Sequence, residues 1–186
     1  MRFNLVCFAF KVAVLAIASG AAFAGDIEFT DVSNTVENEI ITVNGDAQLT
    51  FSDDAIDALN SGIPLVFDLD SRIKQVRRYL PDKKIFQTRR QLTIERHALS
   101  EQFVVTDSIT ADRRVFGTLS SAIENLGRIR NLAITDTGDL PKDATLQFSI
   151  RLKLDIESLP APMVAVAYLS PGWHMSSGWK KWQLTR

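Results

Sequence analysis

The sequence contains almost no cysteine. Its single cysteine, Cys7, lies near the start of the 186-residue chain, so residues 25–186 contain none. Without thiols, this part of the chain forms no disulfide, performs no thiolate chemistry and offers no cysteine ligand to a metal. We therefore expect the fold to be stabilised by its apolar core alone.

Histidine and recognisable catalytic motifs are also scarce. His97 and His174 are the only histidines, and there is no G-x-S-x-G, H-E-x-x-H, G-x-x-x-x-G-K-[ST] or G-x-G-x-x-G motif. The side chains that could join a histidine in a metal site or a hydrolytic triad are Asp68, Asp70, Ser100, Ser176 and Ser177. Their spacing supports neither arrangement. We expect no catalytic residue, metal or cofactor, and predict that the protein is not an enzyme.

The first 24 residues have the three parts of a secretory signal peptide. Arg2 and Lys11 supply positive charge, Val12–Ala18 form a short apolar core, and Ala22-Phe23-Ala24 is an A-x-A cleavage triplet. Cleavage after this triplet would leave residues 25–186 as one exported domain with a net charge of about −3. The alternative is an uncleaved anchor, but Lys11 leaves a run shorter than the ~20 residues that a membrane span needs.

The most regular pattern lies at Thr145–Glu157, where polar and apolar residues alternate throughout. Successive side chains of a strand point to opposite faces of the sheet, so the six apolar residues from Leu146 to Ile156 would share one face. The pattern predicts a strand about 40 Å long, with one buried and one solvated face.

Other segments predict a mainly β fold. Strands are expected at 26–36, 39–51, 63–76, 85–99, 102–106 and 113–116, with Asn44-Gly45 as a hairpin turn. One short helix is expected from Ser52 to Gly62 and another from Thr118 to Gly127. We predict an antiparallel β-sandwich or a strongly curved sheet with two short helices. The alternative is an α+β fold with both helices on one face of an antiparallel sheet.

Charge and tryptophan are concentrated in two places. The hairpin around Pro81 is basic, and all three tryptophans lie within ten residues near the end of the chain. The candidate interaction surface consists of Arg72, Lys74, Arg77, Arg78, Lys83, Lys84, Arg89, Arg90, Trp173, Trp179 and Trp182.

Each part of this surface has two interpretations. The basic residues suit phosphate groups, lipid headgroups or an acidic protein surface, or they keep an edge hairpin soluble. The tryptophans suit a sugar or a partner, or they close the end of the core, which we favour. Asp68 and Asp70 share one face of their strand and could bind a cation, but a solvated face with alternating charges explains them better.

Several segments resemble a known family. They are ALNSGIPL (58–65), RQLTI (90–94), FGTLSSAIENLG (116–127), LKLDIESLP (152–160) and WHMSSGWKKW (173–182). Together they resemble the proteobacterial domain-of-unknown-function family 4390 over nearly all of residues 25–186. The middle hairpin has fewer aromatic residues than the family pattern suggests.

The resemblance implies a small exported protein of Gram-negative bacteria with no assigned activity and no family catalytic residues. Family genes often lie near that of a membrane sensor kinase of the nitrogen-regulation type. We therefore expect a non-enzymatic periplasmic binding module that acts as accessory to an inner-membrane protein partner such as a sensor kinase. The alternative is a carrier of a small envelope ligand, lipid or glycan, with a pocket near the tryptophans. The negative net charge argues against nucleic acid as a partner, and no ligand is identified.

Overall fold

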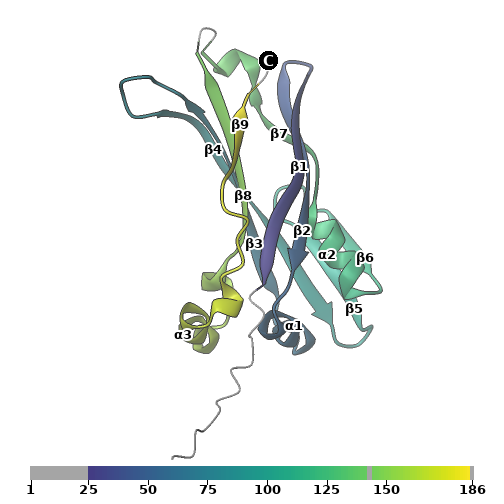
Figure 1. Cartoon of the computed structure of the whole chain (residues 1–186). Coiled ribbons are helices and arrows are strands. Elements are labelled where there is room, and N and C mark those ends of the chain that lie inside the picture. Colours follow the sequence, from purple (N-terminus) through teal and green to yellow (C-terminus); the bar gives the residue numbers. More distant parts are fainter. Residues whose placement is uncertain (1–24, 142–143, 185–186) are drawn as a thin grey trace, which may run out of the picture.

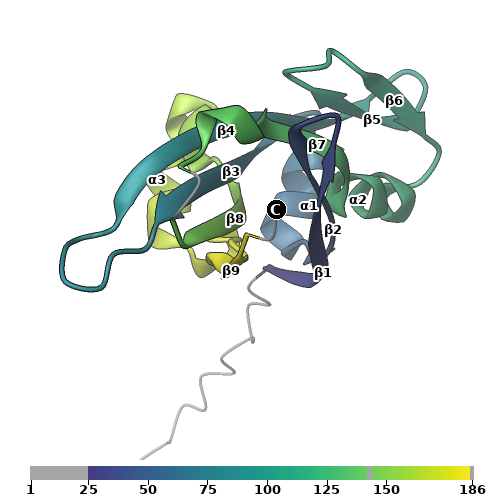
Figure 2. The same ribbon diagram turned by 90° about the horizontal axis from the view of Figure 1, so that it is seen from above.

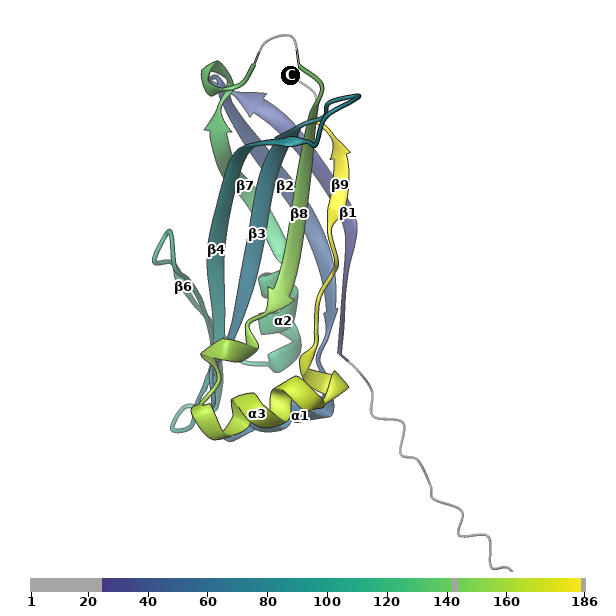
Figure 3. The same cartoon turned by 90° about the vertical axis from the view of Figure 1, so that its left-hand side faces the viewer.

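The computed structural model describes residues 25–141 and 144–184. The predicted signal peptide lies outside the described residues. Two antiparallel sheets pack face to face, as Figures 1 and 3 show. The smaller sheet has the order β1 (Asp26–Glu37), β2 (Ile40–Thr50), β7 (Arg128–Asp136). The larger has the order β6 (Arg113–Phe116), β5 (Gln102–Asp107), β4 (Lys83–His97), β3 (Leu65–Gln75), β8 (Leu146–Leu154), β9 (Lys180–Gln183). The predicted mainly β, antiparallel sandwich is confirmed.

The core lies between the sheets, and the alternation in β8 supplies much of it. The buried apolar side chains of this strand are Leu146, Phe148, Ile150, Leu152 and Leu154. Each contributes about 1.5–3 kcal/mol by leaving water. Phe67 of β3 stacks on Phe51, with ring centroids 5.4 Å apart, and Ile41 and Val43 of β2 cover the other side.

The observed strand is shorter than the predicted 13-residue strand, because β8 spans only Leu146–Leu154. Ile156–Ser158 form a 3-10 turn, η2, and the Asp155 side chain accepts a hydrogen bond from the Glu157 amide at 3.2 Å. The polar–apolar alternation of the sequence continues past the end of the strand. Asp155 is polar whether it starts a turn or lies on the solvated face of a strand, so the pattern does not mark where the strand ends.

The predicted turn at Asn44-Gly45 is wrong. The β1–β2 hairpin turns at Asn38-Glu39, whose φ values of 50° and 66° fit the two left-handed positions of a type I′ turn. Asn44 and Gly45 lie inside β2, where the pairing with β7 shifts register. The Asn44 side chain accepts a hydrogen bond from the Asn131 amide at 2.9 Å. An Asn-Gly pair suits an irregular strand pairing as well as a turn.

The two predicted helices are confirmed as α1 (Asp53–Asn60) and α2 (Leu119–Gly127). The Ser52 hydroxyl caps α1 by accepting from the Ala55 amide at 3.3 Å, and it donates to the Gly172 carbonyl at 2.7 Å. Helix α2 ends at Gly127, where a Cβ atom would lie 2.0 Å from the Ala47 carbonyl oxygen. Only glycine permits this approach of α2 to β2.

The described residues include one α-helix that we did not predict, α3 (Ala161–Leu169), together with the short 3-10 turns η1 (Thr137–Asp139) and η3 (Pro171–Trp173). Proline is tolerated in the first turn of a helix, so Pro162 does not prevent α3 from forming. Helices α1 and α3 lie at the same end of the sandwich (Figures 1 and 3). Within the described residues, no helix is both long and apolar enough to span a membrane.

Candidate functional site

The loop joining β3 to β4 projects from the body of the sandwich and is basic; it is the teal loop in Figures 1 and 2. We call residues 74–84 the β3–β4 arm. Five residues of the predicted surface lie in it: Lys74, Arg77, Arg78, Lys83 and Lys84. The arm contains one acidic residue, Asp82, and none of the five cations forms an ion pair with another described residue. No ion pair with the described residues therefore compensates this positive charge, and Arg78, Lys83 and Lys84 are exposed to solvent.

The tip of the arm also exposes apolar surface. Tyr79 is 86 % exposed and Leu80 is 61 % exposed. The Arg77 Nε donates to the Pro81 carbonyl at 2.9 Å, which closes the loop, and the Arg78 guanidinium lies 5.5 Å from the Tyr79 ring centroid. Aromatic and arginine side chains are the usual anchors of protein interfaces. The tip thus combines such anchors with uncompensated positive charge.

The outer face of the six-stranded sheet differs from our prediction. Asp68 and Asp70, expected on a solvated face, are 0 % and 1 % exposed. Arg89 donates to Asp70 at 2.9 Å and Arg151 donates to it at 2.6 Å, while Lys153 lies 3.2 Å from Asp68. Because β4 and β8 flank β3 in register, long basic side chains from both sides cover the two carboxylates.

These contacts shift the pKa values of the groups involved. Burial raises the pKa of Asp70, but hydrogen bonds from Arg151 and Arg89 outweigh burial, so the pKa lies below its ordinary value. The hydrogen bond to Asp70 raises the pKa of Arg89. Both groups stay ionised at neutral pH. The cluster is an ion-pair network within the sheet, and its cations are less available to a partner.

Two other residues of the predicted surface, Arg72 and Trp179, belong to the same face. The Arg72 guanidinium carbon lies 3.5 Å from the Trp179 ring centroid, and that of Arg151 lies 4.5 Å away. Such cation–π contacts are favourable by about 0.5–2 kcal/mol each. The half-buried Trp179 therefore has part of its ring covered by protein cations.

The remaining predicted residues lie elsewhere. Trp173 is 4 % exposed in the core. Trp182 packs on Phe148 with ring centroids 4.7 Å apart, and its Nε1 donates to Asn34 at 3.1 Å. These two tryptophans fit the favoured interpretation, in which they close the core. Arg90 lies on the inner side of β4, paired with Asp107, because neighbouring strand residues point to opposite faces.

The two histidines lie on different elements. His97 ends β4, with its Nε2 3.2 Å from a Glu95 carboxylate oxygen and 2.7 Å from Arg113. The His174 Nδ1 lies 3.0 Å from the Ser170 carbonyl oxygen. In the described part of the chain, no three His, Cys, Asp or Glu side chains gather in a way that could hold a metal ion.

The sequence did not reveal which residues would meet in space. Arg151 and Lys153 pair with Asp70 and Asp68 from a strand about 80 positions later in the sequence. The polar residues of β8 were predicted to face solvent, and that prediction did not indicate these ion pairs. Asp68 and Asp70 of β3 are opposite in charge to Arg151 and Lys153 of β8, however. That opposition is the signal that could have suggested pairing of these two strands.

Comparison with known protein families identifies a match. A family described as "Domain of unknown function (DUF4390)" matches residues 24–183, which confirms the resemblance seen in the sequence. No curated protein matches the chain, and no solved structure matches it.

Proposed function

The chain belongs to the DUF4390 family, and we propose that it is a non-enzymatic binding module that contacts an acidic surface of a protein partner. The observation that carries the proposal is the projecting β3–β4 arm, with five cations, one carboxylate and the exposed Tyr79 and Leu80 at its tip. Uncompensated charge of one sign accelerates encounter with an oppositely charged partner, and an exposed aromatic residue supplies affinity after contact.

The proposed setting is the periplasm, and the proposed partner is an inner-membrane protein such as the extracytoplasmic part of a sensor kinase. The leader sequence supports export, and the family resemblance supports the association with a kinase. A complementary partner surface would present several carboxylates around a pocket that accepts Tyr79.

A crosslinking pull-down from the cell envelope tests this role. The arm variant reverses the charges of Arg77, Arg78, Lys83 and Lys84 to Glu. A control variant reverses two charges elsewhere, those of Lys180 and Lys181, which are exposed basic residues on the edge strand β9. We expect wild type and control to recover the same inner-membrane protein and the arm variant to lose it. Equal recovery by all three would rule out the arm as the contact surface.

A second candidate, the carrier of lipid or glycan, has one supporting observation. A cavity of about 460 Å³ lies beside Trp173, between the end of β8 and the α3–η3 segment. Its lining mixes Tyr168 and Met175 with Arg89, Lys153 and Glu157. Native mass spectrometry of protein purified from the periplasm separates the two roles, because a co-purifying lipid or glycan favours the carrier and an empty protein the interaction module.

A further inference from the structure

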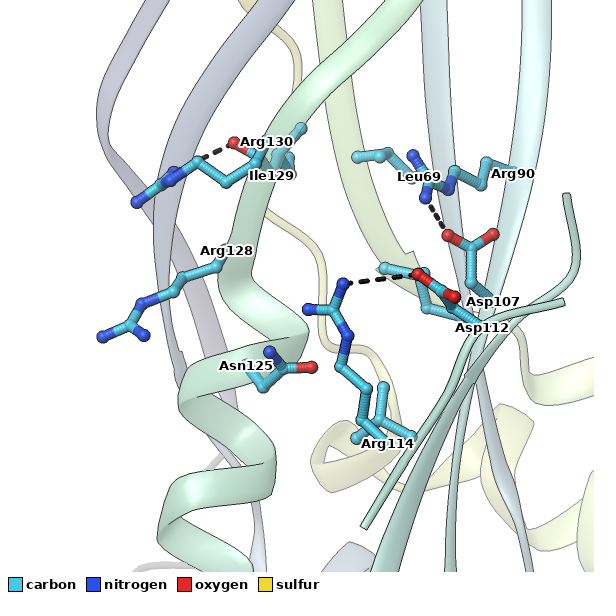
Figure 4. A pocket seen from close by; sticks show the side chains of 11 residues that line it. Leu69, Arg90, Asp107, Asp112, Arg114, Asn125, Arg128, Ile129 and Arg130 are labelled. Carbon is cyan, nitrogen blue, oxygen red and sulfur yellow. Dashed lines mark hydrogen bonds and ion pairs between the residues drawn. The ribbon is translucent and has the colours of Figure 1, made fainter. Parts of the chain in front are cut away.

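A second cavity, on the opposite face of the six-stranded sheet from the Asp68–Asp70 pair, is lined by arginine. It has a volume of about 470 Å³ and opens between β4–β6 on one side and α2–β7 on the other (Figure 4). Its charged lining residues are Arg90, Arg114, Arg128, Arg130, Asp107 and Asp112. Guanidinium groups outnumber carboxylates four to two in this lining, and two of the four pair with Glu124 and Asp46, which do not line the cavity. The volume lies within the range of small-molecule sites.

The floor of the same cavity is apolar. Leu69 of β3, Leu92 of β4, Val105 of β5 and Ile129 of β7 line it. All four belong to, or pack against, the hydrophobic core. The cavity therefore offers apolar contact together with guanidinium N–H donors, which is the combination that an amphiphilic anion requires.

Arg90 occupies an unusual position for a charged residue. It shares the inward face of β4 with Leu92 and Ile94, and its side chain is 18 % exposed. Burial lowers the pKa of its guanidinium. Asp107 pairs with one end of the group, but the buried Nε has no hydrogen-bond partner among the described residues. Leaving a buried donor unsatisfied has an energetic cost, and a bound acceptor would remove it.

Arg114 of β6 lies on the same inner face of the six-stranded sheet as Arg90. Figure 4 shows its guanidinium directed into the space beside Asn125. Its contact with Asp112 is a loose 3.4 Å, so most of its N–H groups remain available. Arg128 and Arg130 point away at the rim in the same view, where they pair with Glu124 and Asp46. Arg90 and Arg114 are therefore the two donors placed to meet a ligand.

We propose that this cavity binds an organic oxyanion, a phosphate or carboxylate carried on an apolar group, with Arg90 and Arg114 donating to its oxygens. The planar fork of each guanidinium matches the geometry of two oxygens on one acid group. The apolar floor accommodates the attached chain. This site shares no residue with the β3–β4 arm, so it goes beyond the proposed function, and either can fail without the other.

Isothermal titration calorimetry of the purified protein tests the site with octyl phosphate below its micelle concentration. Octyl glucoside has the same tail with a neutral head, and inorganic phosphate has the head without the tail. We expect octyl phosphate to bind at least about ten-fold more tightly than either control, since one lost bidentate contact or one lost apolar tail each costs a decade or more. Equal binding of octyl glucoside would overturn the proposal. The affinity for octanoate, measured in the same way, shows whether the site prefers a carboxylate or a phosphate head group.

Two neighbours on β6 supply a matched pair of variants. Arg114 and Arg113 are 59 % and 54 % exposed, but as adjacent strand residues they point to opposite faces. We expect Arg114→Gln to weaken octyl phosphate binding at least about ten-fold and Arg113→Gln to leave it within about two-fold. The same loss in both variants, or in neither, would refute recognition by Arg114.

A conservative variant separates binding from structure at Arg90. Arg90→Lys keeps a cation beside Asp107 but removes the fork. We expect weaker octyl phosphate binding with an unchanged far-UV circular dichroism spectrum. A lower melting temperature with unchanged affinity would show that Arg90 serves only the fold.

Discussion

Arginine and lysine residues of β3 and β4 lie in two regions with opposite surroundings. In the middle of the outer sheet face, Arg89 contacts both Asp68 and Asp70. In the β3–β4 arm, Arg78 and Lys83 form no ion pair with the described residues. Basic residues of the same hairpin therefore belong to an ion-pair network in the middle of the sheet and remain without ion pairs in the arm.

The difference arises from strand register. Asp70 lies opposite Arg89 on β4 and opposite Arg151 on β8, so three strands meet at one carboxylate. The arm extends past Leu146, where β8 begins, and there no carboxylate of the described residues pairs with its cations. In this hairpin, basic residues are therefore available to a partner only in the part that extends beyond the neighbouring strand β8.

The largest expected effect is at the ion-pair network. We expect Asp70→Ala to lower the free energy of unfolding by about 3 kcal/mol, the low end for a broken buried pair, because Arg89 and Arg151 can turn partly to water. Asp82→Ala in the arm should change it by less than about 0.5 kcal/mol. Urea unfolding measures both. Equal losses of unfolding free energy in the two variants would contradict the proposed difference between the ion-pair network and the arm.

The ion-pair network should also respond to acid. The pKa of Asp70 is lowered in the fold, so its contribution is fully present above the unfolded-state pKa and is lost as the pH falls through the native one. We expect the stability gap between wild type and Asp70→Asn to narrow below about pH 4. Urea midpoints from pH 7 to pH 3 measure the gap, and a constant gap would contradict the assignment.

A smaller effect is expected from the stacked tryptophan. Trp179→Ala removes the contacts with Arg72 and Arg151 and should cost about 1–2 kcal/mol. Tyr79→Ala, the matched aromatic change at the arm tip, should cost less than about 0.5 kcal/mol because Tyr79 is exposed. Thermal unfolding of the two variants compares them directly. A larger loss for Tyr79 would mean that the arm packs on the body.

The smallest effect on stability is expected from charge reversal in the arm. Arg78→Glu should change the free energy of unfolding by no more than about 0.5 kcal/mol, yet weaken capture of the proposed partner. Chemical denaturation and the envelope pull-down measure the two properties separately. If the variant lost stability and partner capture together, the arm would be stabilising the fold rather than contacting a partner.

Local chemistry predicted much of this fold. The alternation in β8 identified its buried face, and Ser52 and Thr118 were predicted as the starts of the two helices that they cap, because each feature depends on residues a few positions apart. Strand β7 was missed, since Asn131 adopts a positive φ and breaks the period-two pattern between Ile129 and Leu132. Helix α3 was missed because an all-round apolar run has no helical period to detect.

The chemistry of the surface was less predictable. The burial of Asp68 and Asp70 depends on which strands flank β3, and no local pattern specifies neighbours. The arginines of the inner cavity lie on β4, β6 and β7, and only the tertiary fold brings these strands together. For the arm, the sequence identified the basic stretch, but the projection from the body required the structure.

The hydrogen bond from Ser52 to the Gly172 carbonyl connects positions 120 residues apart. The first helix therefore cannot acquire its complete N-terminal environment until nearly the whole polypeptide is present. Contacts of such long sequence separation form late and slow the search for the native state. If the chain emerges in N-to-C order, this end of the sandwich is completed only after the segment that carries Gly172 has appeared.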